Sequence, residues 1–448
     1  MASDLTQGSI SSWLYRLTAP MVLGIMAIFF FNLVDTYFIG LLGTEPLAAV
    51  SFTFPVTMLI MNLAIGISIA TGAVVARALG QKEKAESRAW VSASLYLSTL
   101  VSASIALITF LNQDRIFLLL GAPEYMLAMI KSFMNIWLPG CVFLILMIVI
   151  NASVRASGNT KLPSLLMLGS AVLNGILDPL LIFGLGPFPE LGIQGAALAT
   201  VISWAVAFAL VLRYILKHDM VTLALPDAIV DKWQRLIKLA LPASLTNMLT
   251  PLASGILVAW IAPYGTHAVA AFGVGTRIEP LVILVVLAFT SSLTPFVGQN
   301  HGAGEHKRIE QALIKCMQFV FVWQVFIYVL LCMFAYPISE MFSDEVEVQS
   351  IIRTFIYIVP MSYFALGFTM VSTATMNALH KTQISLNLNL IRLFVFYLPC
   401  AWLGQYLGGL TGLFWGAAAG NLLMGMMMLS LFLRVRASES LQNKLLKV

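Results

Sequence analysis

Residues 29–40 read FFFNLVDTYFIG, an apolar run suited to lipid except for Asp35. The run belongs to a chain of 448 residues, of which 60% are apolar and only 10% are charged. Because about a quarter of the residues in soluble domains are charged, this composition excludes an ordinary soluble protein. Apolar segments return along the whole chain, which is typical of a multi-pass membrane protein. A carboxylate inside such a segment is costly and demands an explanation.

Twelve segments hold the roughly 20 apolar residues that a helix needs to cross the hydrocarbon core. They predict an all-α polytopic membrane protein with twelve transmembrane helices. Their approximate ranges are 14–40, 47–75, 90–111, 127–153, 162–184, 192–213, 235–260, 267–294, 310–335, 352–376, 386–407 and 411–433.

The basic residues predict the orientation of the chain. Of the 25 Lys and Arg residues, 20 lie in one set of alternating loops and at the two ends. Because Lys and Arg collect on the cytoplasmic side of a membrane, both termini are predicted to be cytoplasmic. The same bias explains the net charge of +5, so we expect the lipid bilayer and no nucleic acid as the partner surface.

No stretch indicates an enzyme. The sequence has no Gly-rich loop followed by Lys-Ser or Lys-Thr, as a P-loop would have, and no catalytic pair of nucleophile and base can be recognised. We therefore expect neither catalysis nor a cofactor, and any transport has to draw its energy from an ion gradient.

The sequence contains an internal repeat. When the chain is aligned with itself so that position 43 matches position 265, other stretches also match at the same offset, which we name the repeat shift. The stretch GTEPLAAVSF (43–52) then lies over GTHAVAAFGV (265–274), and ARALGQKEKAESR (76–88) lies over GQNHGAGEHKRIE (298–310). Six spans in each half predict parallel repeats, with a cleft between them as the place for a substrate. We expect two pseudo-symmetric six-helix lobes around a central cleft: an N-terminal lobe at 1–213, a cytoplasmic linker at 214–234, and a C-terminal lobe at 235–448.

A buried polar cluster is predicted in the outer part of the first half. Asn174 and Asp178 are four residues apart and share a helix face, as do Ala196 and Thr200 on the next span. At a rise of about 1.5 Å per residue, Asp35 and Asp178 lie about 8 and 9 Å below the outer end, and Ala196 and Thr200 about 6 and 12 Å. All five residues are therefore predicted to lie in one layer.

Two buried carboxylates repel each other and lose hydration, so such a site accepts either a proton or a cation among oxygen ligands. The carboxylates, the Asn174 amide, the Thr200 hydroxyl and a backbone carbonyl form an oxygen set suited to Na⁺. The alternative is a hydrogen-bonded polar cluster that only stabilises the packing of the helices. Under the repeat shift Asp35 lies over Leu257 and Asp178 over Cys400, so the acids are not duplicated. This asymmetry favours a function confined to the first half.

Three further residues leave two interpretations open. Pro20, four turns below Asp35, is either a hinge or a fixed kink. Arg277 and Glu279 lie two residues apart within one span, so each needs its own partner. They either line the central cleft or form ion pairs between helices.

The stretches DTYFIGLLGTEPLAAVSF, NGILDPLLIFGLGPFPELGIQGAALAT and GQNHGAGEHKR resemble the multidrug and toxic compound extrusion (MATE) transporters. Within this family the sequence is similar to the prokaryotic DinF-like branch. The resemblance implies an ion-coupling or proton-coupling site at Asp35, Asn174, Asp178, the Ala196 carbonyl and Thr200. It also implies that the first helix bends at Pro20, and that Asn151 lies in the substrate cavity.

From this resemblance we expect a cation-coupled antiporter, driven by H⁺, Na⁺ or both. It would export amphipathic, often cationic, organic compounds across a bacterial or archaeal inner membrane, as a monomer. The alternatives are a lipid-linked oligosaccharide flippase, whose clefts tend to be strongly cationic, and a membrane scaffold that transports nothing. Other branches place an acid in span seven or ten, and this sequence has none there.

Overall fold

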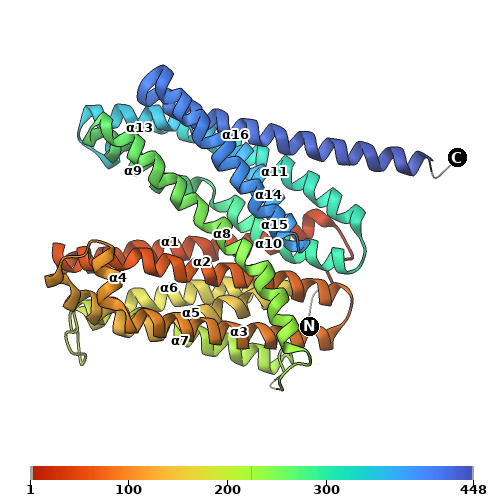
Figure 1. The fold of residues 1–448 in the computed structure, drawn as a ribbon, viewed down its shortest axis with the longest axis horizontal. Helices are drawn as coiled ribbons and strands as arrows, with labels where there is room; N and C mark the ends of the chain where they lie inside the picture. The colour runs from red at the N-terminus through yellow and green to blue at the C-terminus, as the bar shows by residue number, and fades with distance from the viewer. Residues whose placement is uncertain (1–3, 223, 446–448) are drawn as a thin grey trace. The chain divides into compact units, whose positions relative to one another are not determined.

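The computed structural model describes residues 4–222 and 224–445, and all regular structure within these ranges is helical (Figure 1). The first half contains α1 (Ile10–Leu41), α2 (Thr44–Gly80), α3 (Lys84–Leu111), α4 (Gln113–Leu119), the 3₁₀ turn η1 (Glu124–Met126), α5 (Leu127–Ala156), α6 (Lys161–Ile182) and α7 (Ile193–Lys217). The second half contains α8 (Ile229–Ile261), the 3₁₀ turn η2 (Ala262–Tyr264), α9 (Thr266–Val282), α10 (Leu284–Gly302), α11 (His306–Met333), α12 (Ala335–Phe342), α13 (Val346–Ile358), the 3₁₀ turn η3 (Pro360–Ser362), α14 (Tyr363–Ala378), α15 (Thr382–Leu390), the π-helix η4 (Ile391–Tyr397) and α16 (Leu398–Leu445).

The described residues contain the twelve predicted spans. Ten helical segments are long and apolar enough to cross a membrane, and α9 with α10 form an eleventh that is bent by 43°. The last of the ten segments runs from Thr382 to Ser430, but Gly408 and Gly409 have non-helical backbone angles inside it. This break divides the segment into two spans and brings the total to twelve.

The helix boundaries confirm the internal repeat. Three pairs of helices begin at positions related by the repeat shift. They are α2 and α9 at positions 44 and 266, α3 and α11 at positions 84 and 306, and α4 and α12 at positions 113 and 335. The residues before α2 and α9, Gly43 and Gly265, both have positive φ angles, 115° and 96°. Glycine adopts such angles without the steric cost that a Cβ adds. The repeat therefore extends to the backbone of the turns.

The predicted linker 214–234 contains helical turns at both of its ends. The helix α7 continues to Lys217 and α8 begins at Ile229, so part of the predicted linker 214–234 is helical. Both helices extend beyond their apolar segments through Lys- and Arg-containing turns. The lobe boundaries at 213 and 235 stay predictions.

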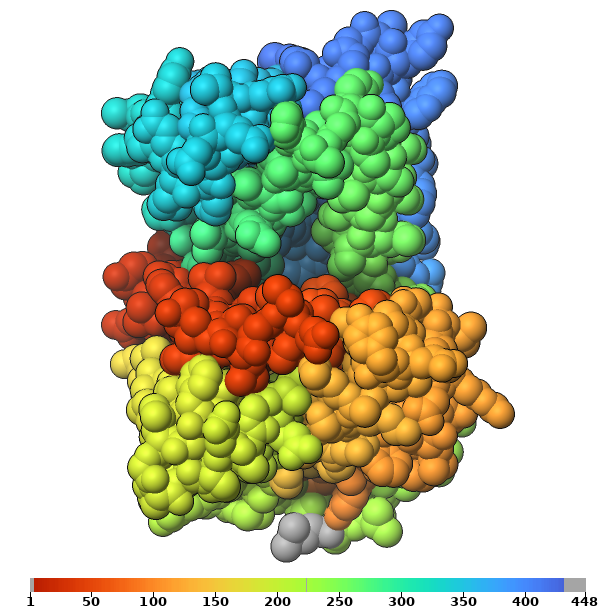
Figure 2. All heavy atoms as spheres, turned by 90° about the vertical axis from the view of Figure 1, so that its left-hand side faces the viewer, coloured from red at the N-terminus to blue at the C-terminus, as the bar shows by residue number. Residues whose placement is uncertain are grey.

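Contacts divide the chain into two compact units. The first comprises residues 1–245 with 291–309 and 377–381, and the second comprises 246–290, 310–376 and 382–448. In the first unit α5 packs against α2, α3 and α7, while α1 packs mainly against α6. Figure 2 shows this second pairing, with α1 in red beside α6 in yellow. The pairing brings the helix that bears Asp35 to the helix that bears Asp178.

Apolar side chains fill both units. In the first unit a buried cluster surrounds α5 and includes Phe117, Trp137 and Trp204. In the second unit a cluster from α9, α13, α14 and α16 includes Phe355 and Phe414, whose rings meet edge to face at 5.5 Å. Each unit thus has a core of its own.

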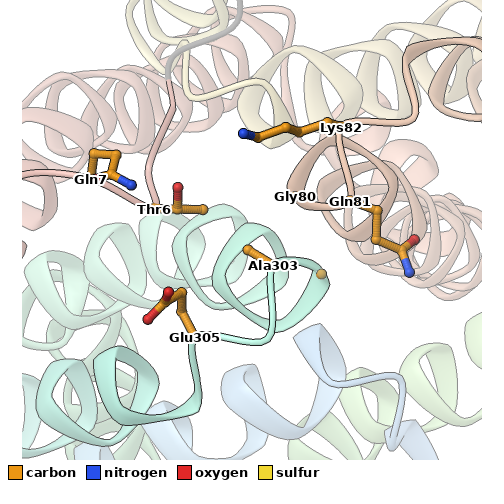
Figure 3. Close-up of a pocket in the computed structure, with 8 residues that line it drawn as sticks. Thr6, Gln7, Gly80, Gln81, Lys82, Ala303 and Glu305 are labelled. Carbon is orange, nitrogen blue, oxygen red and sulfur yellow. The ribbon is translucent and has the colours of Figure 1, made fainter.

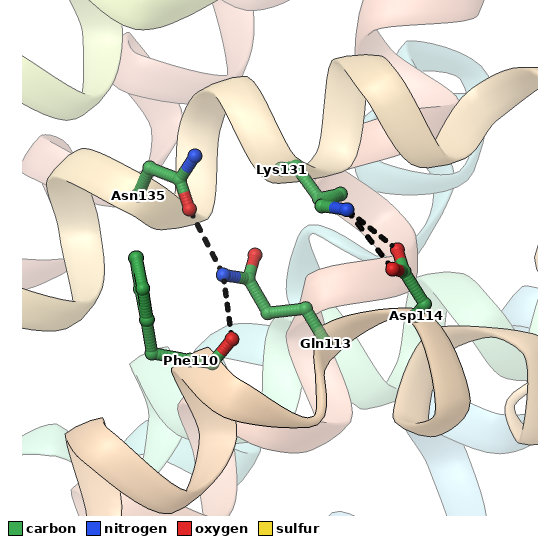
Figure 4. Close-up of polar contacts among 5 residues, drawn as sticks. All are labelled: Phe110, Gln113, Asp114, Lys131 and Asn135. Carbon is green, nitrogen blue, oxygen red and sulfur yellow. Dashed lines mark hydrogen bonds and ion pairs between the residues drawn. The ribbon is translucent and has the colours of Figure 1, made fainter.

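Polar contacts fasten the short helix α4 to α5 (Figure 4). The Gln113 side-chain amide, 3% exposed, donates to the Phe110 carbonyl at 3.2 Å and to Asn135 Oδ1 at 2.9 Å. Lys131 Nζ lies 2.8 Å from the Asp114 carboxylate. These contacts fix the turn between α3 and α4 against α5.

A glycine on α7 allows close packing near the predicted site. A Cβ at Gly195 would lie less than 3.0 Å from the Leu181 carbonyl oxygen of α6, whereas a Cβ at Gly169 of α6 would have no neighbour within 4 Å. Gly195→Ala is therefore expected to destabilise the protein by about 1–3 kcal/mol through overpacking. Gly169→Ala is expected to be neutral, or to stabilise by up to about 1 kcal/mol through helix propensity. Unfolding of the purified protein in detergent measures both changes, and equal midpoints would contradict the close approach.

Candidate ion-coupling site

The helices α6 and α7 bring three of the predicted polar residues together. Asn174 and Asp178 lie one turn apart on α6, and both are 0% exposed. The Asn174 amide nitrogen donates to Asp178 Oδ1 at 3.2 Å and to Thr200 Oγ1 on α7 at 3.3 Å. The shared face and the shared depth inferred from the sequence thus correspond to contacts in the fold.

Asp35 approaches this group from α1. Its carboxylate lies close enough to Asp178 for the two charges to interact. The neighbouring Val34 lies 3.6 Å from the place that a Cβ on Gly175 would take, which shows how closely α1 and α6 pack here. This is an ordinary van der Waals distance, so α1 and α6 are in contact beside Asn174.

Three oxygens of the group are buried without a hydrogen-bond partner: Asp35 Oδ1, Asn174 Oδ1 and Asp178 Oδ2. Among the described residues, no ion pair joins Asp35 or Asp178 to a basic side chain. Unpartnered buried carboxylate oxygens are costly unless a proton or a cation accompanies them. The site has two carboxylates, and the Asn174 carbonyl and Thr200 hydroxyl add neutral oxygen atoms, so the residues present fit either occupant.

Ala196 lies in the first turn of α7 and is fully buried in a small apolar cluster with Ile39 of α1 and Ile182 of α6. The cluster ties the three helices of the site together near their ends. Coordination of an ion by the Ala196 carbonyl stays a prediction.

The other predicted residues lie apart from this cluster. Pro20 is half-buried inside α1, which is a continuous helix from Ile10 to Leu41. Asn151 of α5 is 3% exposed, and its Oδ1 has no hydrogen-bond partner. Their roles as hinge and cavity residue stay predictions.

Arg277 and Glu279 diverge on α9, as their spacing requires. Arg277 is exposed, whereas Glu279 is half-buried and lies beside the Tyr363 hydroxyl, within electrostatic range of Arg392. Tyr397 also interacts with both charges. This arrangement favours the interpretation of Glu279 as the partner of a basic residue on another helix.

Tyr363, Arg392 and Tyr397 form a group that the sequence pattern did not predict. The signal in the sequence was Arg392, a basic residue within an apolar span, but Glu279, within its electrostatic range, belongs to a distant span. Arg392 and Tyr397 belong to the π-helix η4, and π-helical turns are frequent at functional sites. The apolar pattern of this span does not predict such a turn.

Comparisons with known proteins identify the family. The sequence profile of the MatE family matches the chain twice, at residues 20–180 and 242–403, with the second match offset by the repeat shift. The chain belongs to the MATE family of transporters. It is accordingly a multi-pass membrane transporter and not an enzyme.

Three similar proteins represent the matches. A protein of Shewanella oneidensis named FAD transporter is 40% identical over 426 residues, which cover 94% of this MATE chain and 94% of the relative. The multidrug export protein MepA of Staphylococcus aureus is 29% identical over 359 residues, covering 79% of this chain and 76% of MepA. A crystal structure of the Vibrio cholerae MATE transporter VcmN in the bent form is 37% identical, covers 96% of this chain and 98% of VcmN, and superposes with a TM-score of 0.92.

The contact between α6 and α7 yields a stability prediction for this MATE transporter. Thr200→Val keeps the side-chain shape but removes the oxygen that accepts from Asn174, so we expect a loss of about 1–3 kcal/mol. Thr200→Ser keeps the oxygen and is the matched control. Unfolding in detergent measures both variants. A valine variant as stable as the serine variant would show that the hydroxyl is not needed.

Proposed function

We propose that the protein is a cation-coupled antiporter that exports amphipathic organic compounds. The observation that supports this proposal best is the pair of neighbouring acids, half-buried Asp35 and fully buried Asp178, each with a buried oxygen that has no partner and with no basic partner among the described residues. Intramembrane ionisable residues without a structural partner are functional by default.

The physical basis of coupling is charge compensation. A carboxylate at the centre of a membrane helix costs about 2.5–3.5 kcal/mol, and a second nearby carboxylate adds repulsion. A proton or Na⁺ entering from outside removes this cost. Because the two acids lie on α1 and α6, their repulsion and its relief act on the packing between these helices. Occupancy and helix arrangement are thereby linked.

We propose that α1 responds by bending at Pro20. Proline removes one backbone hydrogen bond and weakens the helix where it stands. Asp35 follows about four turns later on the same helix, about 22 Å away along its axis. The similarity to VcmN, which has been crystallised in a form described as bent, supports this part of the proposal. Bending would constrict the cavity of the first half and release the substrate.

Two substrate classes follow from two observations. The wider family resemblance favours amphipathic, often cationic, drugs, and MepA is named as a multidrug exporter. The relative with 40% identity is named as a transporter of FAD, which is an anion. FAD and a lipophilic cationic dye differ in charge, but each contains an aromatic ring system. A transport assay that offers each compound separately distinguishes the two classes.

The remaining parts of the proposal concern the orientation in the membrane, the cellular location and the oligomeric state. The distribution of Lys and Arg favours cytoplasmic termini, and the prokaryotic relatives favour an inner-membrane location. Each compact unit has its own core, which is compatible with a monomer.

Export by an Asp35→Asn variant tests the coupling. The amide mimics a permanently neutral carboxyl group, so imposed gradients should no longer drive export, and the rate should fall at least tenfold. The measurement is efflux of FAD and of a cationic dye from proteoliposomes, with pH and Na⁺ gradients imposed separately. Glu45→Gln, at an exposed acid at the start of α2, is the control and should retain export. Gradient-driven export by correctly inserted Asp35→Asn at the parental rate would exclude the scheme.

Export by a Pro20→Ala variant tests the hinge. Alanine restores the missing hydrogen bond and stiffens α1, so transport should fall at least tenfold while the folded protein is equally or more stable. Pro242 occupies the equivalent position under the repeat shift, in the half that lacks the acids. Pro242→Ala should therefore retain more export than Pro20→Ala. Equal rates for Pro20→Ala and the parent would indicate a fixed kink.

A further inference from the structure

The segment Asp4–Ser9, which precedes α1, is docked onto other helices, and we name it the N-terminal latch. Leu5 is 0% exposed although Asp4, Gln7, Gly8 and Ser9 around it are exposed. The Asp4 carboxylate accepts hydrogen bonds from the backbone and hydroxyl of Thr6, which lower the pKa of Asp4 below its usual value. The latch is therefore an ordered turn that directs one apolar side chain inward.

Side chains of α10 hold both backbone polar groups of Leu5. The Leu5 amide donates to Gln299 Oε1 at 3.0 Å, and the Leu5 carbonyl accepts from Asn300 Nδ2 at 3.2 Å. Gln299 and Asn300 are 3% and 0% exposed. Gln299 also donates to the Ala156 carbonyl at the end of α5, at 2.7 Å. One glutamine thus joins the latch, α10 and α5.

Arg308, on the first turn of α11, holds the rest of the latch. Its Nη2 donates to the Leu5 carbonyl at 3.3 Å and its Nη1 to the Gly8 carbonyl at 3.1 Å. Its Nε donates to Asn300 Oδ1 at 3.0 Å. A planar guanidinium with several fixed donors suits such a multiple contact, whereas a lysine ammonium does not.

The latch lies beside a close contact between equivalent parts of the two repeats. A Cβ on Gly80 of α2 would lie less than 3.0 Å from the Gln299 carbonyl oxygen, and a Cβ on Gly302 of α10 would lie equally close to the Arg77 carbonyl oxygen. Positions 77 and 80 correspond to 299 and 302 under the repeat shift. The ends of α2 and α10 therefore pack backbone against backbone, in a reciprocal contact.

A polar cavity of about 450 Å³ separates the latch from these helix ends (Figure 3). Thr6 and Gln7 of the latch line it on one side, and Lys82 and Ala303, from the turns after α2 and α10, line it as well. The latch is thus held at Leu5 and by Arg308, while its Thr6–Gln7 stretch borders open space.

The equivalent position in the other repeat uses a different contact. Arg308 corresponds to Glu86 of α3, which forms an ion pair with Lys232 at the start of α8. Lys232 also lies over the Trp90 ring, 4.4 Å from its centroid, and Trp233 donates to the Ala93 carbonyl. The start of α8 is thus held by side chains of its own helix, whereas the approach to α1 is held through backbone carbonyls of a non-helical segment.

We propose that the N-terminal latch is a releasable clasp that fastens the start of α1 to the end of α10 and the start of α11, and that Arg308 must release it before α1 moves away from these helices in the transport cycle. This inference rests on the proposed function, because only an alternating-access cycle requires that movement. Release exposes Leu5 and breaks the contacts of Arg308, while the ion-coupling site on α1, α6 and α7 is left unchanged.

Labelling of Leu5→Cys tests whether Arg308 holds the latch. In the full-length protein without its four native cysteines, a water-soluble maleimide should react slowly at this buried position. Adding Arg308→Ala should accelerate labelling at least tenfold, and Arg308→Lys should accelerate it by less. Lys307→Ala, at the exposed neighbour, should leave it unchanged. Labelling that is equally fast with and without the Arg308→Ala substitution would overturn the proposed role of Arg308, whatever the transport activity.

A reversible cross-link tests whether release is needed for transport. Thr6 and Ala303 line the same cavity, so the Thr6→Cys, Ala303→Cys pair can be joined by a cleavable bifunctional maleimide. We expect export to fall at least tenfold on cross-linking and to return on cleavage, while each single cysteine variant is unaffected. Export that continues at the uncross-linked rate would overturn the clasp. Failure of the proposed function would instead appear as absence of export by the parental protein.

Discussion

The central constraint on this protein is the cost of two neighbouring carboxylates on membrane-spanning helices, one fully buried and one half-buried, with no basic partner among the described residues. Asp178 shares the Asn174 amide with Thr200, and Asp35 faces Asp178 from α1. A neutral hydrogen-bond donor such as Asn174 compensates only part of a negative charge. The arrangement stays favourable while a positive charge is present. In the proposed transport cycle, the packing of α1 against α6 and α7 depends on that charge.

Duplication of the chain makes the asymmetry of its polar groups informative. The helix starts, the glycine turns and even the proline at position 20 recur in the second half under the repeat shift, but Asp35 and Asp178 correspond to Leu257 and Cys400. The second half has instead its own ionisable group around Glu279 and Arg392, in which the charges are opposite. The two halves thus share a scaffold and differ in whether a basic side chain lies within electrostatic range of their membrane acids.

The sequence was sufficient for features that depend on local periodicity. Span lengths follow from the rise per residue. The shared face of Asn174 and Asp178 follows from the number of residues per turn, and the repeat follows from matching stretches of sequence. The structure has all three. Contacts between distant segments were harder to predict. Arg392, near Glu279, lies in a π-helix that the apolar pattern does not indicate, and the docking of Leu5 depends on Gln299 and Asn300, far along the chain. The bend between α9 and α10 was also not anticipated, although Pro280 and Pro295 lie in these helices.

The reciprocal contact of Gly80 and Gly302 has an evolutionary consequence. Two identical subunits related by a twofold axis meet through the same patch on each, so that residue i touches j and j touches i. The pairs Gly80–Gln299 and Gly302–Arg77 have this form within a single polypeptide. An ancestor of half the length would have made this interface as a homodimer, in which a single glycine codon served both sides. Joining two such copies in one chain would free them to diverge, and Glu86 and Arg308 have different partners at equivalent positions.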